Sequence, residues 1–306
     1  MKKTHFERAI FLSWYCSRGN CKFCYMSTQK NKIKNPKLAK RKTESILAEV
    51  VICKAAGWEI EFLSGGYESY DFKELLDLIK KIKQIYGKKL WLNLGVLKEE
   101  ELIQAKPYII GVTGAIECIN QKLHDELCPS KPISEIKEMF SICDRLGLKK
   151  SITIVIGLGE SLDDIPLLVD FIKKNKIDRI TFYALNPHPG TPFKKGPETG
   201  YYVQWIKKIR ETFPKLEIIA GSWVNRLQEV HELLNAGADY ITKFPSIKLF
   251  GSKYARQIED ECALAGRKFE GTMTDKSKLN FDKYLSGIKE RQLKSKIKSK
   301  IKEYIS

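Results

Sequence analysis

Short apolar runs rich in β-branched residues alternate along the chain with longer segments in which apolar residues recur at helical spacing. The helical segments stop at glycines such as Gly57, Gly147 and Gly237, which commonly end helices. We predict strands at residues 9–15, 59–63, 90–94, a run ending at 117, 151–156, 179–185, 216–220 and 240–244.

Helices are predicted between these strands, at residues 36–57, 72–86, 99–105, 134–146, after Ser161, after Tyr201 and at 226–235. Eight strand-then-helix units predict an α/β fold with a parallel sheet, closed as a (βα)8 TIM-type barrel. An open or partial barrel with six core strands is the alternative. In either architecture, active residues are expected at the C-terminal ends of the strands.

The end of the chain has a different pattern, with Ile288, Leu293, Ile297 and Ile301 near helical spacing and lysines between them. We therefore expect residues 1–283 to form the barrel and residues 284–306 a lysine-rich helix that packs on it. An arm that binds nucleic acid or a partner is the less favoured interpretation.

Composition adds limits on location and partners. The 306 residues contain no apolar run long enough for a membrane span and no secretory pattern, so we expect a cytoplasmic protein without membrane association. The net charge of +17 suggests an acidic partner, whether nucleic acid, a phosphorylated substrate or an electron-transfer protein. Richness in Ile, Lys and Glu also occurs in heat-adapted proteins, so the charge has a compositional explanation too.

Three of the eight cysteines, Cys16, Cys21 and Cys24, are clustered as C-x4-C-x2-C directly after the first predicted strand. Thiolates at this spacing can hold an iron–sulfur cluster, and Arg18 and Lys22 are expected to favour deprotonation. A structural zinc site would need a fourth ligand, which no nearby residue supplies. A [2Fe-2S] ferredoxin could use Cys53, although the repeated strand–helix pattern is not expected of a small electron carrier. Spacing alone also leaves chance occurrence open.

The segment from Cys16 to Cys24 resembles the signature of the radical S-adenosylmethionine (SAM) superfamily, with Phe23 before the last cysteine. The resemblance implies a [4Fe-4S] cluster held by Cys16, Cys21 and Cys24, SAM on the open iron, and Phe23 near the adenine. The first gap is one residue longer than is usual in that family.

Further segments at predicted strand ends resemble SAM-binding motifs of the same family. Ser64-Gly65-Gly66-Tyr67-Glu68 resembles its glycine-rich segment, which implies contacts from Ser64, Gly65, Gly66 and Glu68 to the methionyl amino group. Glu117 closes an apolar strand, where a carboxylate needs a partner. The resemblance implies a contact from Glu117 to the ribose or ammonium of SAM, with capping at the surface as the alternative. Lys137 is the nearest cation for the carboxylate.

The segments that begin at Ile156-Gly157 and at Leu185-Asn186-Pro187 resemble the G-x-G-E and PHPGTP motifs of the biotin synthase-like branch, which includes HydE and PylB. The resemblance implies that Leu185, Asn186 and Pro187, at the end of the sixth strand, line the adenine pocket, and that Ile156 and Gly157 also bind SAM. Later strand ends place Trp223, Arg226 and Lys243 toward the expected substrate region.

The family resemblance implies reductive cleavage of SAM, an external ferredoxin or flavodoxin as electron donor, and hydrogen abstraction from a small-molecule substrate. Strands 90–94 and 151–156 lack the cysteines of a second cluster, which argues against biotin synthase. The long first gap resembles the HmdB (HcgA) maturases of the iron-guanylylpyridinol cofactor of [Fe]-hydrogenase. A HydE- or PylB-like enzyme for an amino-acid-derived substrate is the main alternative. RNA modification is less favoured, because no RNA-binding domain accompanies the barrel, and a plain electron carrier is least favoured.

Overall fold

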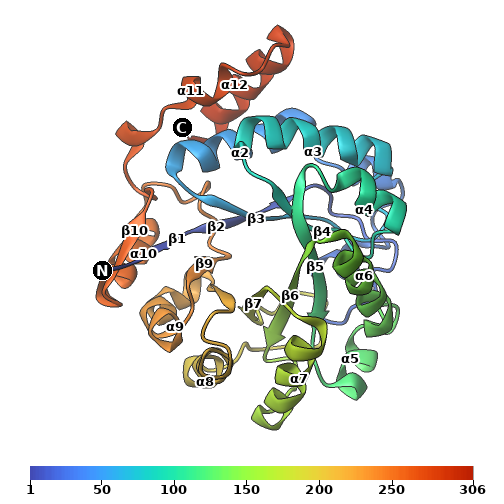
Figure 1. Cartoon of the computed structure of the whole chain (residues 1–306). Coiled ribbons are helices and arrows are strands. Elements are labelled where there is room, and N and C mark those ends of the chain that lie inside the picture. Colours follow the sequence, from blue (N-terminus) through green and yellow to red (C-terminus); the bar gives the residue numbers. More distant parts are fainter. Residues whose placement is uncertain (306) are drawn as a thin grey trace.

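The computed structural model describes residues 1–305, in which eight parallel strands form one sheet in sequence order, surrounded by helices (Figure 1). The strands are β2 (Glu7–Phe11), β3 (Glu59–Ser64), β4 (Leu90–Asn93), β5 (Ile109–Glu117), β6 (Lys149–Ile156), β7 (Arg179–Ala184), β8 (Glu217–Gly221) and β9 (Tyr240–Thr242). A parallel bridge between Phe6 and Ile241 brings the two edges of the sheet together. The predicted α/β barrel is confirmed.

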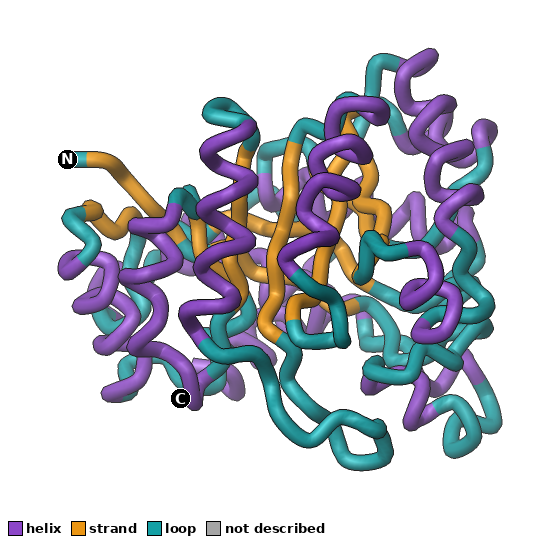
Figure 2. The backbone as a smooth tube through the Cα atoms, turned by 90° about the horizontal axis from the view of Figure 1, so that it is seen from below, coloured by secondary structure: helices purple, strands orange, loops and turns teal. Residues whose placement is uncertain are grey.

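The helices cover the outside of the sheet, as the purple segments around the orange strands of Figure 2 show. They are α1 (Tyr25–Gln29), α2 (Thr43–Ala56), α3 (Phe72–Tyr86), α4 (Glu99–Ala105), α5 (Gln121–Leu127), α6 (Ile133–Leu146), α7 (Ile165–Asn175), α8 (Thr199–Thr212), α9 (Val230–Ala236), α10 (Lys253–Leu264), α11 (Phe281–Leu285) and α12 (Arg291–Ile305). Short 3-10 helices lie at Pro36–Ala39, Leu162–Asp164, Val224–Glu229 and Lys276–Lys278. Among the described residues, no helix combines the length and apolar character needed to cross a bilayer.

Helix α3 illustrates how sequence produces these elements. Asp71 caps its first turn by accepting hydrogen bonds from the amides of Lys73 and Glu74. Leu75, Leu78, Ile79 and Ile82 recur every three or four residues and are buried against the barrel. Gly87 ends the helix with φ of 81°, a left-handed conformation that glycine adopts without a steric penalty.

Two predicted boundaries in the first unit were wrong. The first strand ends at Phe11 rather than at residue 15, and the helix predicted over residues 36–57 is interrupted before α2 begins at Thr43. The amide of Arg41 donates to the carbonyl of Leu12, and Ser13 forms an antiparallel bridge with Lys40. This pairing holds residues 40–42 extended and separates the 3-10 turn from α2.

The two ends of the chain add structure outside the barrel. Strand β1 (Lys2–His5) pairs in parallel with β10 (Arg267–Glu270), a small second sheet that the sequence did not predict. The last helix, α12, lies beside α2 in Figure 1 and buries Ile297 and Ile301.

Candidate active site

A cavity of about 1150 Å³ opens where the strands end, and residues from most of the barrel strands or the loops after them line it. Cys16, Cys21 and Cys24 lie on its wall as free, half-buried thiols. In the described part of the chain, no other cysteine lines this cavity. Its size exceeds the usual range of ligand pockets, so it can hold a cofactor together with a second molecule.

The cysteine loop is fixed by contacts to two neighbouring segments. The amide of Ser17 donates to the carbonyl of Tyr67 at 3.0 Å, and the Arg18 guanidinium lies 3.9 Å from the centre of the Tyr67 ring. On the other side, the amide of Lys22 donates to the carbonyl of Leu127, at the end of α5. The loop is therefore held between the segment after β3 and the segment after β5.

The expected effect of Arg18 and Lys22 on the thiols was wrong. Arg18 forms an ion pair with Glu135, and Lys22 one with Glu126, so both charges are neutralised away from the cysteines. These pairs anchor the loop to α5 and α6 instead.

The cation that acts on the thiols is Lys131. A hydrogen bond with the Cys128 thiol lowers the pKa of Cys21, burial opposes this, and the Lys131 ammonium lowers it further, to about 7. Burial raises the pKa of Cys24 to about 11. Because iron is cationic, its binding would stabilise the thiolate forms of Cys21 and Cys24.

Lys131 also forms the main ion pair of the cavity wall. Its ammonium lies 3.3 Å from Oε1 of Glu117, and Thr153 donates its hydroxyl to Oε2 of the same carboxylate at 3.3 Å. Glu117 ends β5 with φ of 63°, a left-handed conformation that is uncommon for a residue with a side chain. This strained turn directs the carboxylate to the cavity, where its partner removes most of the cost of burial.

Gly66 is required by the close approach of two loops. A Cβ atom built on it would overlap Cβ of Cys16 and the carbonyl oxygen of Tyr15. Gly65 would meet Oγ of Ser69 at 2.9 Å. The glycine pair therefore lets the segment after β3 lie directly against the first cysteine.

The donor set of this loop fits a cluster better than a single metal ion. Among residues 1–305, no three His, Cys, Asp or Glu side chains converge on one ion. Three thiols spread along one cavity wall suit a cluster in which each ligand binds a different iron. Cys53 does not join them, since it is fully buried in α2, where burial raises the pKa of its thiol to about 12.

Comparison with known proteins decides the family. Residues 13–172 match the model of the radical SAM superfamily. The chain belongs to this superfamily. Its members use a [4Fe-4S] cluster and SAM, so the protein is an enzyme of the radical SAM type.

Relatives place the chain within the superfamily only broadly. An uncharacterized protein of Methanocaldococcus jannaschii is 44% identical over 88% of this chain and 75% of its own length. A biotin synthase of Methanococcus aeolicus is 26% identical over 58% of this chain and 55% of its own length. The chain thus aligns with little more than half of that synthase.

The fold is similar to the crystal structure of methylornithine synthase (PylB). The TM-score is 0.72, with 18% sequence identity, and the match covers 94% of this chain and 86% of that structure. At this identity the likeness shows a shared barrel fold.

The structure brings most of the predicted SAM-binding residues to the cavity and leaves others outside. Those that line it, besides the cysteines, are Phe23, Ser64, Gly65, Gly66, Glu117, Leu185 and Asn186. Pro187 is not among the lining residues. Ile156 is fully buried, and its carbonyl accepts a hydrogen bond from Leu185, while the amide of Gly157 donates to Glu160.

Glu68 and Lys137 also lie outside this cavity. Glu68 is exposed and borders a separate groove toward α4 and α6. The exposed ammonium of Lys137 lies 5.9 Å from the centre of the Phe171 ring, on the outer surface of the barrel. The cation that faces the cavity is Lys131, and no periodic pattern marked it because it lies in the turn between α5 and α6.

A polar group below the cavity was not predicted from the sequence. Glu61, in β3, is fully buried and accepts hydrogen bonds from the hydroxyls of Tyr183 and Thr242, both of which line the cavity. Burial raises the pKa of this carboxyl. An acidic residue inside an otherwise apolar strand was the available signal.

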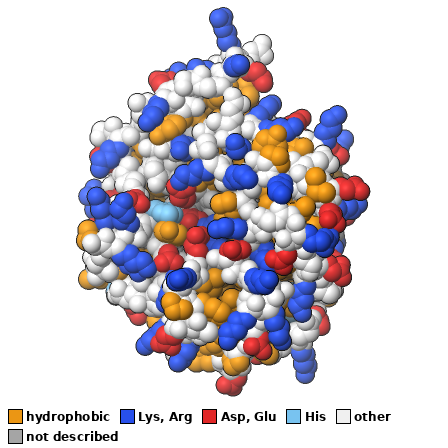
Figure 3. Space-filling view, in the orientation of Figure 1, with side chains coloured by type: hydrophobic (Ala, Val, Ile, Leu, Met, Phe, Trp, Pro, Cys, Tyr) orange, Lys and Arg blue, Asp and Glu red, His pale blue; other side chains and the backbone are white. Residues whose placement is uncertain are grey.

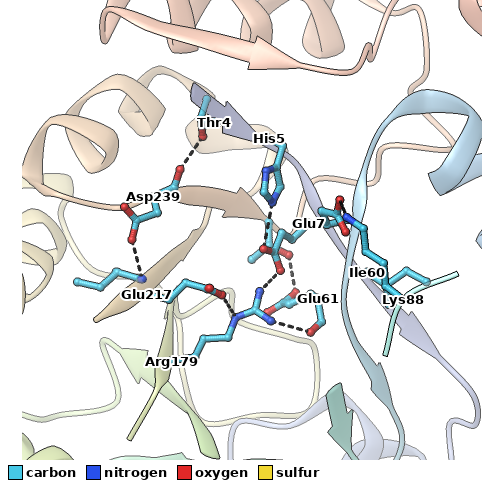
Figure 4. Close-up of polar contacts among 12 residues, drawn as sticks. Thr4, His5, Glu7, Ile60, Glu61, Lys88, Arg179, Glu217 and Asp239 are labelled. Carbon is cyan, nitrogen blue, oxygen red and sulfur yellow. Dashed lines mark hydrogen bonds and ion pairs between the residues drawn. The ribbon is translucent and has the colours of Figure 1, made fainter. Parts of the chain in front are cut away.

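Deeper in the barrel, Arg179 pairs with Glu7 and Glu217 and donates to the backbone carbonyl of Glu61 (Figure 4). His5 contacts the same Glu7 carboxylate at 3.2 Å. Glu7, Arg179 and Glu217 are the first residues of β2, β7 and β8, so this network lies at the N-terminal end of the barrel.

Proposed function

We propose that the protein holds a [4Fe-4S] cluster through Cys16, Cys21 and Cys24 and uses SAM in the adjoining cavity to abstract hydrogen from a small molecule. The supporting observation is that the three thiols, the Gly65-Gly66 pair and the Glu117–Lys131 pair share one cavity. Cluster and SAM, once bound, supply reductive cleavage to methionine and a 5′-deoxyadenosyl radical.

The residues of the chain position these groups and exclude water. The backbone of Ser64-Gly65-Gly66 can approach an amino group closely, because neither glycine carries a side chain. Glu117 offers a carboxylate for a SAM ammonium or ribose hydroxyl. Lys131, in place of Lys137, is the cation that binds the methionyl carboxylate. The adenine is contacted by Phe23, Leu185 and Asn186.

Cysteine variants test this proposal. Anaerobic reconstitution should give about four irons per chain, and Cys16→Ala, Cys21→Ala or Cys24→Ala should abolish the cluster absorbance. The matched control is Cys53→Ala, which removes a thiol far from the cavity. Loss of the cluster in the control, or an intact cluster in the other variants, would contradict the proposal.

For the pathway, the finer proposal is biosynthesis of the iron-guanylylpyridinol cofactor of [Fe]-hydrogenase. It is supported by the four-residue gap between Cys16 and Cys21, which resembles the long gap of the HmdB maturases. A neighbouring [Fe]-hydrogenase gene, and a pyridinol precursor that raises 5′-deoxyadenosine formation, are the expected findings.

A HydE- or PylB-like reaction on an amino-acid-derived substrate is the second candidate. Two observations support it: the segment from Leu185 to Pro192 resembles that branch, and the fold resembles PylB. Stimulation of 5′-deoxyadenosine formation by amino acids, and not by pyridinol precursors, would favour it.

A further inference from the structure

Lys243 follows β9 in a backbone conformation that costs energy. Its φ is 77°, within the left-handed region that residues with a side chain rarely adopt. The side chain lines the same cavity as the cysteines. Strain of this kind persists where the surrounding structure requires one direction of a side chain.

Aromatic rings surround the ammonium of Lys243. Nζ lies 4.3 Å from the ring centre of Tyr183, 5.7 Å from that of Phe11 and 6.0 Å from that of Trp223. Gly221, the last residue of β8, makes room for this arrangement. A Cβ atom there would lie 2.8 Å from Cγ of Lys243 and would also overlap the Tyr183 ring.

Among the described residues, no carboxylate forms a direct ion pair with the Lys243 ammonium, whereas most other cations around the cavity are paired or exposed. Arg8 pairs with Glu49, Arg18 with Glu135 and Lys131 with Glu117. Lys32 and Lys34 are exposed loop residues at the rim. The Glu61 carboxylate interacts with Lys243 electrostatically, but it is fully buried and its hydrogen bonds come from the hydroxyls of Tyr183 and Thr242.

Lys243 also faces the site from the wall opposite the Glu117–Lys131 pair. In the sheet order β2 to β9, three strands lie between β5 and β9, so the two strands are on opposite sides of the eight-stranded barrel. In the proposed function, the Glu117–Lys131 pair contacts SAM, so SAM occupies the β5 side of the cavity. The ammonium of Lys243, which directly follows β9, therefore faces the space left for the substrate.

We propose that Lys243 binds a carboxylate of the substrate, whose apolar part lies against Trp223 and Phe11. This inference rests on the proposed function and names the substrate class of the same site. One ammonium between aromatic rings balances a single negative charge. A doubly charged phosphate would keep one charge unmatched in a partly desolvated site, which is costly.

Binding of simple probes to the reconstituted protein with SAM tests the inference by calorimetry. Benzoate should bind at least about tenfold more tightly than benzamide, its neutral counterpart, as a charged hydrogen bond would give. Lys243→Asn should abolish this preference. Asparagine tolerates a positive φ, so the variant removes the charge with little added strain. Lys243→Arg should retain the preference.

Lys248→Asn is the matched control, because Lys248 is exposed and does not line the cavity. Equal binding of benzoate and benzamide, or no binding of either, would overturn the inference. So would an undiminished preference in Lys243→Asn, or tighter binding of phenyl phosphate than of benzoate. Release of 5′-deoxyadenosine with dithionite is measured separately in the same wild-type preparation, and its absence would count against the proposed function instead.

Discussion

At the scale of single residues, the buried carboxylates Glu7, Glu49 and Glu61 are each accompanied by an opposite charge or by hydrogen-bond donors. Glu7 is fully enclosed, and burial alone would raise its pKa, yet Arg179 and His5 hold it below the ordinary 4.5. A pair of this kind is costly to break, because the remaining ion stays buried without its partner.

Glu7→Gln should therefore destabilise the protein by about 3 kcal/mol at pH 7. Because the folded pKa of Glu7 lies below its unfolded value, the carboxylate stabilises the fold above pH 4.5 and loses this effect as pH falls through the folded pKa. Urea unfolding at pH 7 and at lower pH should show the difference from wild type shrinking with acid. Glu99→Gln, at an exposed ion pair, serves as control. A difference that is constant with pH would contradict the assignment.

Glu117→Gln should weaken SAM binding about tenfold while the cluster is retained, since a charged hydrogen bond is lost. Titration of SAM into the reconstituted variant measures this. Glu68→Gln is the matched control, because its side chain lies outside the cavity. Unchanged affinity in Glu117→Gln would leave the residue as the structural partner of Lys131.

Residues at the site could be predicted where they follow a strand or a recognisable motif. The three cysteines, Gly65-Gly66 and Glu117 satisfy this condition, and all line the cavity. Lys131 could not be predicted, because its role depends on a turn that folds back over β5. Lys137 was chosen by distance along the chain, but the helical geometry of α6 turns it outward.

At the scale of elements, periodicity predicted the helices that bury one face. It did not predict the two strands in which polar residues dominate. Strands β1 and β10 carry mostly polar or charged residues, and their pairing joins positions more than 260 residues apart. Neither strand has an apolar run that a local pattern could reveal. Helix α12 was visible because Ile297 and Ile301 keep helical spacing.

Ile297→Ala should lower the free energy of unfolding by about 2–5 kcal/mol, because the side chain is fully buried and its loss leaves a cavity. Chemical denaturation followed by circular dichroism measures the change. Lys296→Ala, next to it on the exposed face, should have little effect. Equal stability of both variants would show that α12 does not contribute to the folded barrel.

At the scale of the whole molecule, the eight repeated units made the barrel predictable, because each apolar strand needs a helix to cover it. Closure of the sheet depends on a contact between Phe6 and Ile241 that no local pattern encodes. The shape of the cavity likewise depends on the loops, which have no periodic signal.

The excess of 54 basic over 37 acidic side chains is also a property of the whole molecule. In Figure 3, Lys and Arg side chains are spread over the visible face, with acidic residues between them. One basic segment has a particular position: residues 30–37 follow the cysteine loop, and Lys32 and Lys34 lie at the rim of the cavity. An acidic ferredoxin or flavodoxin that docks there would approach the cluster-binding loop.

Turnover driven by such a protein donor should therefore fall as salt rises, while turnover driven by dithionite should change little, because screening acts on the encounter of two charged surfaces. Lys32→Glu with Lys34→Glu should slow only the donor-driven reaction. The matched control is Lys173→Glu with Lys174→Glu, which makes the same charge change near the end of α7.

RNA binding should be weak and fade by physiological salt, as sequence-independent phosphate contacts do. Equal slowing by both double variants would assign the effect to net charge, and selective RNA binding that survives such salt would assign the basic surface to RNA.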